Sequence, residues 1–108
     1  MNDEDLVQAV LAGFLEESEP LLVKLEKSIT SKDIKDACMV AHTLKGSAAN
    51  VSAEMVSASF SELEASLKSA SESDVTEHLK KVQVQMKDLE KEIRRYLSWT
   101  PFSMFRDR

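Results

Sequence analysis

The sequence predicts an all-α fold, an antiparallel four-helix bundle, and two observations carry this prediction. The 108 residues include only two Gly and two Pro, too few for the many tight corners of an all-β sandwich or a doubly wound α/β fold. Four stretches instead carry apolar residues at helical spacing, and the last three follow one another through short polar connections. We assign residues 1–97 to the bundle and residues 98–108 to an aromatic C-terminal tail.

The first helical stretch is expected from about Asp5 to Thr30. Its inward stripe is apolar and consists of Val7, Val10, Leu11, Phe14, Leu15, Leu21, Leu22, Leu25 and Ile29. Gly13 in this stretch is expected to mark close helix packing rather than part of a docking surface. Pro20 removes a backbone donor and crowds the carbonyl of Glu16. We therefore expect either a kink near Pro20 or a split into two abutting helices, which would add a fifth short helix.

The second stretch begins at residues 31–33, where the side-chain oxygens of Ser31 and Asp33 can cap free backbone N–H groups. It runs to Val51 and keeps small and apolar residues at alternating steps of three and four. This inward stripe consists of Ile34, Ala37, Ala41, Leu44, Ala48 and Val51. The alternation predicts an amphipathic helix with one buried face.

The third and fourth stretches repeat this spacing. The third begins near Ser52, which can serve as its N-cap, and its stripe is Val56, Phe60, Leu63, Leu67 and Ala70. A polar turn over residues 71–73 leads to the fourth, which begins near Asp74. Its stripe is Val75, Leu79, Val82, Met86, Leu89, Ile93 and Leu97. Short connections between amphipathic helices predict that neighbours in sequence pack antiparallel.

The last ten residues differ from the bundle in composition. They hold Trp99, Phe102 and Phe105, which are half of the six aromatic residues of the chain. Two interpretations stay open: the tail folds back over one end of the bundle, or it forms a docking or dimer contact. We expect a monomer in the first case and a tail-mediated dimer in the second.

Composition and charge exclude several classes of function. The two glycines, Gly13 and Gly46, lie far apart, so no Gly-rich loop can hold nucleotide phosphates. The net charge of −5, with acidic and basic side chains mixed along the chain, gives no footprint for nucleic acid. No apolar stretch reaches the roughly 20 residues of a membrane span, and the single Cys38 cannot form an internal disulfide. We expect a cytoplasmic chain whose partner is a protein, with no direct membrane insertion.

The second stretch also carries the residues best suited to chemistry. At about 100° per residue, His42 lies about 130° from the centre of the core stripe, so its imidazole is expected in solvent. Lys45 and Gly46 follow by three and four residues and are its neighbours in the next turn. A side chain at position 46 would lean back over the imidazole, and glycine leaves that space open. The same exposed face carries Lys35, Cys38, Met39 and Ala49.

An exposed imidazole, open space and a flexible cation together suit the transfer of a phosphoryl group. Neutral imidazole, with a pKa of about 6.5, can attack phosphorus, and Lys45 can stabilise the negative charge that arrives with it. No Asp or Glu neighbours His42 on its own helix, and the chain has no metal or nucleotide motif. We therefore expect a phosphoryl carrier, not a self-sufficient enzyme, with the catalytic apparatus supplied by its partner.

The run from Ala41 to Asn50, AHTLKGSAAN, resembles the signature of histidine-containing phosphotransfer (HPt) domains of bacterial two-component phosphorelays. Two flanking patterns also resemble that family: Phe14, Leu15 and Glu16 with Leu21, Leu22 and Leu25, and Phe60, Leu63 and Glu64. The resemblance covers residues 5–97 and implies a four-helix bundle whose histidine accepts a phosphoryl group from a receiver-domain aspartate and passes it to another receiver. By position, it implies that His42 is phosphorylated, Lys45 is its charge partner and Gly46 gives clearance.

The resemblance also implies partners and a location. Receiver domains of response regulators are the expected partners, with a histidine kinase as a further one. No cofactor of the chain's own is implied, and Mg²⁺ is expected in the partner receiver. Docking is expected to use the exposed face with Lys35, Cys38, Met39 and Ala49. The chain would act in the cytoplasm, or as the cytoplasmic part of a larger sensor kinase.

Two alternatives to the relay stay open. An HPt-type domain of a chemotaxis-like kinase, phosphorylated by an ATP-binding kinase domain, shares the same signature. A helical interaction module without chemistry would tolerate any residue at position 42. A kinase dimerisation domain is disfavoured, because that family usually has an acidic residue directly after its histidine and a proline a few residues on, where Thr43 and Ser47 stand here.

One position departs from the family pattern. Ser52 stands at the turn between the second and third helices, where the family commonly has Gly. A left-handed backbone would be strained by Ser. We therefore expect either that Ser52 acts as an N-cap or that this corner differs locally.

Overall fold

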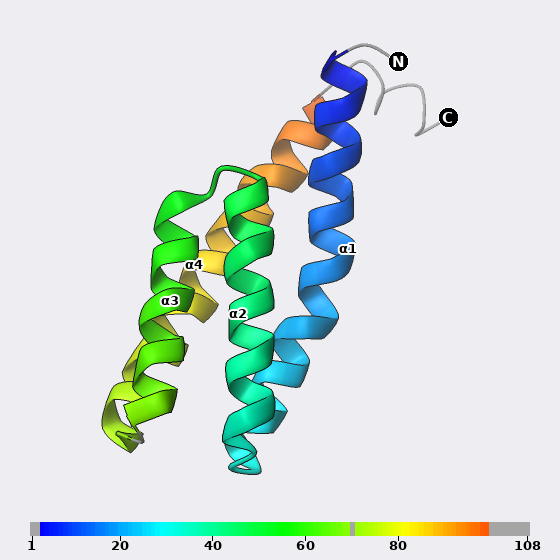
Figure 1. Cartoon of the computed structure of the whole chain (residues 1–108). Coiled ribbons are helices and arrows are strands. Elements are labelled where there is room, and N and C mark those ends of the chain that lie inside the picture. Colours follow the sequence, from blue (N-terminus) through cyan, green and yellow to red (C-terminus); the bar gives the residue numbers. More distant parts are fainter. Residues whose placement is uncertain (1–2, 70, 100–108) are drawn as a thin grey trace.

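A computed structural model describes residues 3–69 and 71–99, with the side chain of Trp99 left out (Figure 1). It contains four helices: α1 (Asp3–Thr30), α2 (Ile34–Asn50), α3 (Glu54–Ser69) and α4 (Glu72–Trp99). No strand occurs in these residues. Each helix contacts the next, and α1 also contacts α4, so the helices pack as a ring around one core. The prediction of an all-helical fold with four helices is confirmed.

The four helices differ in length. α1 and α4 have 28 residues each, whereas α2 has 17 and α3 has 16. The start of α1 and the end of α4 therefore extend beyond the turn between α2 and α3 (Figure 1). Over this extension, α1 has no neighbour from α2 or α3.

α1 passes through Pro20 as one helix, so the expected split into two helices does not occur. Among the residues described, the helices number four rather than five; the kink stays a prediction. The expectation that Val7 and Val10 face inward was wrong, because both are exposed on the part of α1 that extends beyond α2 and α3. Gly13 does not mark close packing either, since a Cβ there would meet no atom within 4 Å apart from its own helix backbone.

The turn after α2 uses a left-handed residue that is not glycine. Ser52 has a φ of 62° and donates its backbone N–H to the carbonyl of Ala49 at 3.0 Å. The N–H of Ala53 donates to the carbonyl of Ala48 at 2.9 Å, which completes a Schellman motif. The turn after α1 has the same form, with Lys32 at a φ of 61°. Ser52 therefore does not cap α3, so this expectation was wrong; Ser52 itself adopts the left-handed backbone.

The start of α2 agrees with its sequence. Asp33 is the N-cap, and its side chain accepts a hydrogen bond from the backbone N–H of Asp36 at 3.2 Å. α3 begins at Glu54, after the left-handed turn, and α4 begins at Glu72, two residues before the expected start. The boundaries therefore shift by about two residues while the elements stay the same.

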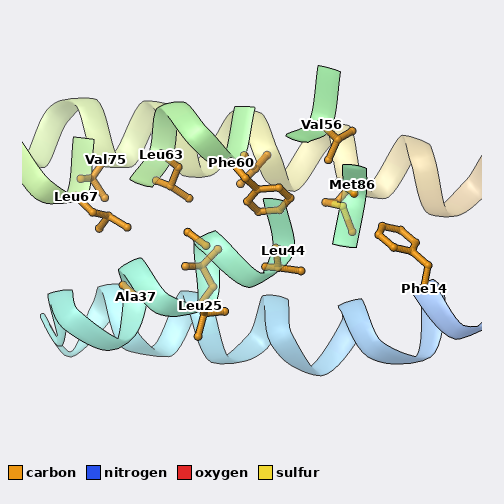
Figure 2. Close-up of a cluster of buried hydrophobic side chains, with 14 of the residues drawn as sticks. Phe14, Leu25, Ala37, Leu44, Val56, Phe60, Leu63, Leu67, Val75 and Met86 are labelled. Carbon is orange, nitrogen blue, oxygen red and sulfur yellow. The ribbon is translucent and has the colours of Figure 1, made fainter. Parts of the chain in front are cut away.

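The core follows the inward stripes of the four helices. Figure 2 shows Phe14 and Leu25 of α1, Leu44 of α2, Phe60 of α3 and Met86 of α4 in one buried cluster. On α2 the fully buried residues are Ala37, Ala41, Leu44 and Ala48. Val40 is also buried although it was not expected on the inward stripe, and Ile34, which was expected there, is exposed. Small residues on the inner face of α2 bring this helix close to its neighbours and turn its opposite face outward.

Candidate functional site

His42 lies near the middle of α2, on the face opposite the core. Its side chain is 68% exposed, whereas Ala41 and Leu44 on the inner face are fully buried. The position agrees with the helical spacing, which put the imidazole on the solvent side. Burial of the inner face thus fixes the backbone beneath a ring that stays accessible to a partner.

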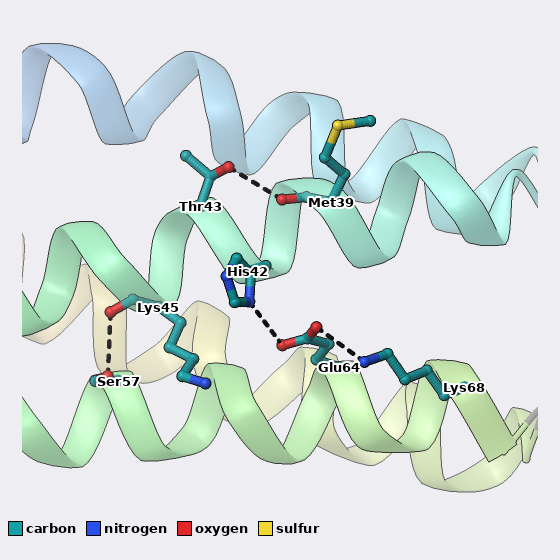
Figure 3. A network of polar contacts seen from close by, with 7 residues as sticks. All are labelled: Met39, His42, Thr43, Lys45, Ser57, Glu64 and Lys68. Atoms are coloured by element: carbon teal, nitrogen blue, oxygen red, sulfur yellow. Dashed lines mark hydrogen bonds and ion pairs between the residues drawn. The ribbon is translucent and has the colours of Figure 1, made fainter.

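A carboxylate from the neighbouring helix reaches the ring of His42. Figure 3 shows Glu64 of α3 between His42 and Lys68. Its Oε1 lies 3.4 Å from Nδ1 of His42, and its Oε2 lies 3.2 Å from Nζ of Lys68. Helical spacing indicates acidic neighbours only on the helix of His42, so it did not predict this contact. The sequence indicated Glu64 only through the pattern Phe60, Leu63 and Glu64, which resembles the family.

The surroundings of Glu64 keep it charged. Only 14% of its side chain is exposed, and this burial would raise its pKa. Hydrogen bonds and positive charge from Lys68 and His42 act in the opposite direction and outweigh burial, so the pKa of Glu64 lies below its ordinary value. Glu64 therefore presents a carboxylate to Nδ1 at neutral pH, and Lys68 holds that carboxylate from the other side.

Lys45 and Gly46 lie in the turn that follows His42. Lys45 is half-buried, and Figure 3 shows its side chain directed toward α3, on the same side as the ring. Its backbone carbonyl accepts a hydrogen bond from Oγ of Ser57 at 3.1 Å, and its Nζ pairs with no carboxylate in the part of the chain that the structure describes. A Cβ at Gly46 would meet no atom within 4 Å apart from its own helix backbone. The space that glycine leaves is therefore open to solvent.

The four expected docking residues divide into two groups. Lys35, Met39 and Ala49 are exposed on the same side of α2 as His42. Cys38 is half-buried and packs against the core, and burial raises the pKa of its thiol. Cys38 is therefore a packing residue with limited access, which corrects its placement on the open face.

Two further findings concern the wider molecule. Within residues 3–69 and 71–99, no three His, Cys, Asp or Glu side chains lie close enough to hold a metal ion. None of the helices there is long and apolar enough to cross a membrane. The aromatic side chains expected to form the tail contact, those of Trp99, Phe102 and Phe105, lie outside the described part of the chain.

Comparison with known proteins gives one result that agrees with this geometry. The sequence model of the Hpt domain matches residues 9–98, a span that includes all of α2 and α3. No curated protein and no solved structure matches the chain. Hpt domains take part in phosphotransfer in two-component signalling and interact with receiver domains and kinases. The chain belongs to the Hpt domain family.

Proposed function

We propose that His42 accepts a phosphoryl group from the aspartate of one receiver domain and passes it to the aspartate of another. The observation that carries this proposal is the exposed imidazole whose Nδ1 faces the carboxylate of Glu64 at 3.4 Å. When the ring proton is on Nδ1, that nitrogen donates to Glu64 and the lone pair of Nε2 is available. The contact therefore selects which nitrogen attacks.

The transfer conserves the phosphoryl group and needs no oxidant or nucleotide. Nε2 of His42 forms a bond to phosphorus while the bond between phosphorus and the receiver's aspartate oxygen breaks. The electron pair of the broken bond stays on the aspartate, which leaves as a carboxylate. The ring gains positive charge as the new bond forms, and the carboxylate of Glu64 stabilises this charge through the Nδ1 proton.

Lys45 and Gly46 support the same step from the next turn of α2. The ammonium of Lys45, which pairs with no carboxylate among the residues that the structure describes, can approach the equatorial oxygens of the phosphoryl group and lower their negative charge. Gly46 keeps the surface beside the ring low, so that the partner's aspartyl phosphate can come within bonding distance. Apart from its two chain neighbours and the backbone of its own helix, no described atom lies within 4 Å of a Cβ at Gly46, so the clearance concerns the partner rather than the ring of His42 itself.

The remaining parts of the reaction belong to the partner. We expect the receiver to supply Mg²⁺ and the groups that activate its aspartate, while this chain carries the phosphoryl group between two receivers. Lys35, Met39 and Ala49 are exposed beside His42 and are expected to contact the receiver. This role belongs in the cytoplasm, either for a free chain or for a domain of a sensor kinase.

The test is phosphoryl transfer from a panel of phosphorylated receivers to the purified chain. Labelling is expected to be acid-labile and alkali-stable, as for a phosphoramidate. His42→Gln should abolish it, while His78→Gln, at the second histidine, should leave it unchanged. Helicity of both variants, measured by circular dichroism, should equal that of the parent chain. Undiminished labelling of His42→Gln would refute the assignment. Labelling by an ATP-dependent kinase domain but by no receiver would favour the chemotaxis-like alternative.

A further inference from the structure

The apolar stripe of α1 continues for two turns beyond the part of the helix that α2 and α3 reach (Figure 1). Phe14 is buried, with 5% of its surface exposed. Val10 and Val7 lie one and two turns earlier on the same stripe and are 44% and 46% exposed, and Leu6 beside them is 53% exposed. The turn that joins the end of α2 to the start of α3 lies below this region (Figure 1). Leu6, Val7 and Val10 form an apolar surface, here called the α1 patch, that no described helix covers.

α4 ends close to the α1 patch (Figure 1). α4, which ends at Trp99, contacts α1, and the last turns of α4 lie at the same end of the molecule as the start of α1 (Figure 1). Residues 100–108 follow with the sequence TPFSMFRDR. A segment of this length spans up to about 30 Å, and the first three turns of α1 rise about 16 Å. The segment is therefore long enough to reach every residue of the α1 patch.

The composition of residues 100–108 complements the α1 patch. Phe102, Met104 and Phe105 supply apolar side chains for a surface that otherwise exposes two valines and a leucine to water. Two arginines, Arg106 and Arg108, follow these apolar residues. The first turn of α1, directly before the patch, is acidic and consists of Asp3, Glu4 and Asp5. A segment that runs antiparallel to α1 thus brings its apolar residues to the α1 patch and its arginines to the acidic first turn.

We propose that residues 100–108 pack on the α1 patch of the same molecule, antiparallel to α1, with Phe102 against Val10, Phe105 against Val7 and the two arginines near the acidic first turn. The segment then completes the core at the end of the bundle where α2 and α3 are too short to cover α1. This proposal is independent of the phosphotransfer function, because it involves no residue of the site around His42. A second copy of the chain is the competing occupant of the patch.

The test is amide hydrogen exchange of the full chain, measured for residues 3–14. In the Phe102→Ser/Phe105→Ser variant, exchange in these residues should rise about tenfold or more. The start of α1 can then open without breaking contacts to the segment, so the free energy of local opening is lower. Exchange in α2 and α3 should not change. Val84→Ser is the matched control, since Val84 is an exposed apolar residue on α4 and its loss should leave residues 3–14 as they are. Unchanged exchange in the double variant would overturn the proposal.

Two further measurements separate the segment from a second copy. Protection of residues 3–14 should be independent of protein concentration over about a hundredfold range, because the contact is within one molecule. Protection that rises with concentration would overturn the proposal in favour of a dimer. The charge contribution is tested by Arg106→Glu/Arg108→Glu, which should raise exchange in residues 3–14 less than the loss of both phenylalanines does. The effect should shrink in high salt, and no effect at low salt would remove the arginines from the contact.

Discussion

The inner and outer faces of α2 hold different kinds of residue, although they belong to the same 17-residue helix. The inner face has Ala41 and Leu44 fully buried, and its packing fixes the helix in the bundle. The outer face has Met39, His42 and Gly46 exposed, and none of them is needed to fill the core. A substitution on the inner face should therefore change the free energy of unfolding, whereas one on the outer face should change phosphoryl transfer.

The largest expected effect comes from Leu44→Ala on the inner face. Removing a fully buried leucine side chain should lower the free energy of unfolding by about 2–5 kcal/mol, from lost burial and the cavity left behind. Urea denaturation measures this change. His42→Gln is the control on the outer face and should stay within about 0.5 kcal/mol of the parent chain. At urea concentrations below the transition, Leu44→Ala should still accept the phosphoryl group; loss of labelling by a folded Leu44→Ala would break the separation of the two faces.

The separation of the two faces could be predicted from the sequence, because helical spacing fixes which residues share a side. The same spacing could not predict that Val7 and Val10 are exposed. Periodicity identifies the apolar face of a helix, but coverage of that face depends on where the neighbouring helices end. α2 and α3 are shorter than α1, and their relative position is a property of the assembled bundle.

The contact between His42 and Glu64 could not be derived from helical spacing either. The two residues are 22 positions apart and lie on different helices. Their approach depends on the turn after α2, where Ser52 adopts a left-handed backbone that is more common for glycine. Such a backbone is strained for a residue with a Cβ such as Ser. Two backbone hydrogen bonds, from Ser52 and Ala53 to the end of α2, offset the strain and keep the turn.

A smaller effect on stability, combined with an effect on transfer, is expected for Gly46→Ala. Gly13 is the matched control: both glycines are exposed in helix interiors, and a Cβ at either would meet no atom within 4 Å apart from the helix backbone. Each Ala variant should gain up to about 1 kcal/mol of unfolding free energy, from better helix propensity. Gly46→Ala alone should slow transfer, because position 46 is one turn from His42. Equal transfer rates for the two variants would remove the clearance role of Gly46.

The smallest expected effect is the pH dependence that Glu64 adds where α3 meets the outer face of α2. Because the pKa of Glu64 is lower in the folded chain than its ordinary value, its carboxylate stabilises the fold above the unfolded pKa of about 4.3. That stabilisation is lost as the pH falls through the lower folded pKa.

Glu64→Gln should therefore reduce the free energy of unfolding at pH 7 by less than about 1 kcal/mol, since the two partners of Glu64, His42 and Lys68, are largely exposed to solvent. The difference between the two chains should narrow toward about pH 3, measured by urea denaturation at both pH values. A difference that stays constant with pH would show that Glu64 acts through packing rather than through its charge. In that case the role proposed for its carboxylate, the stabilisation of a positively charged His42 ring, would have to be given up as well.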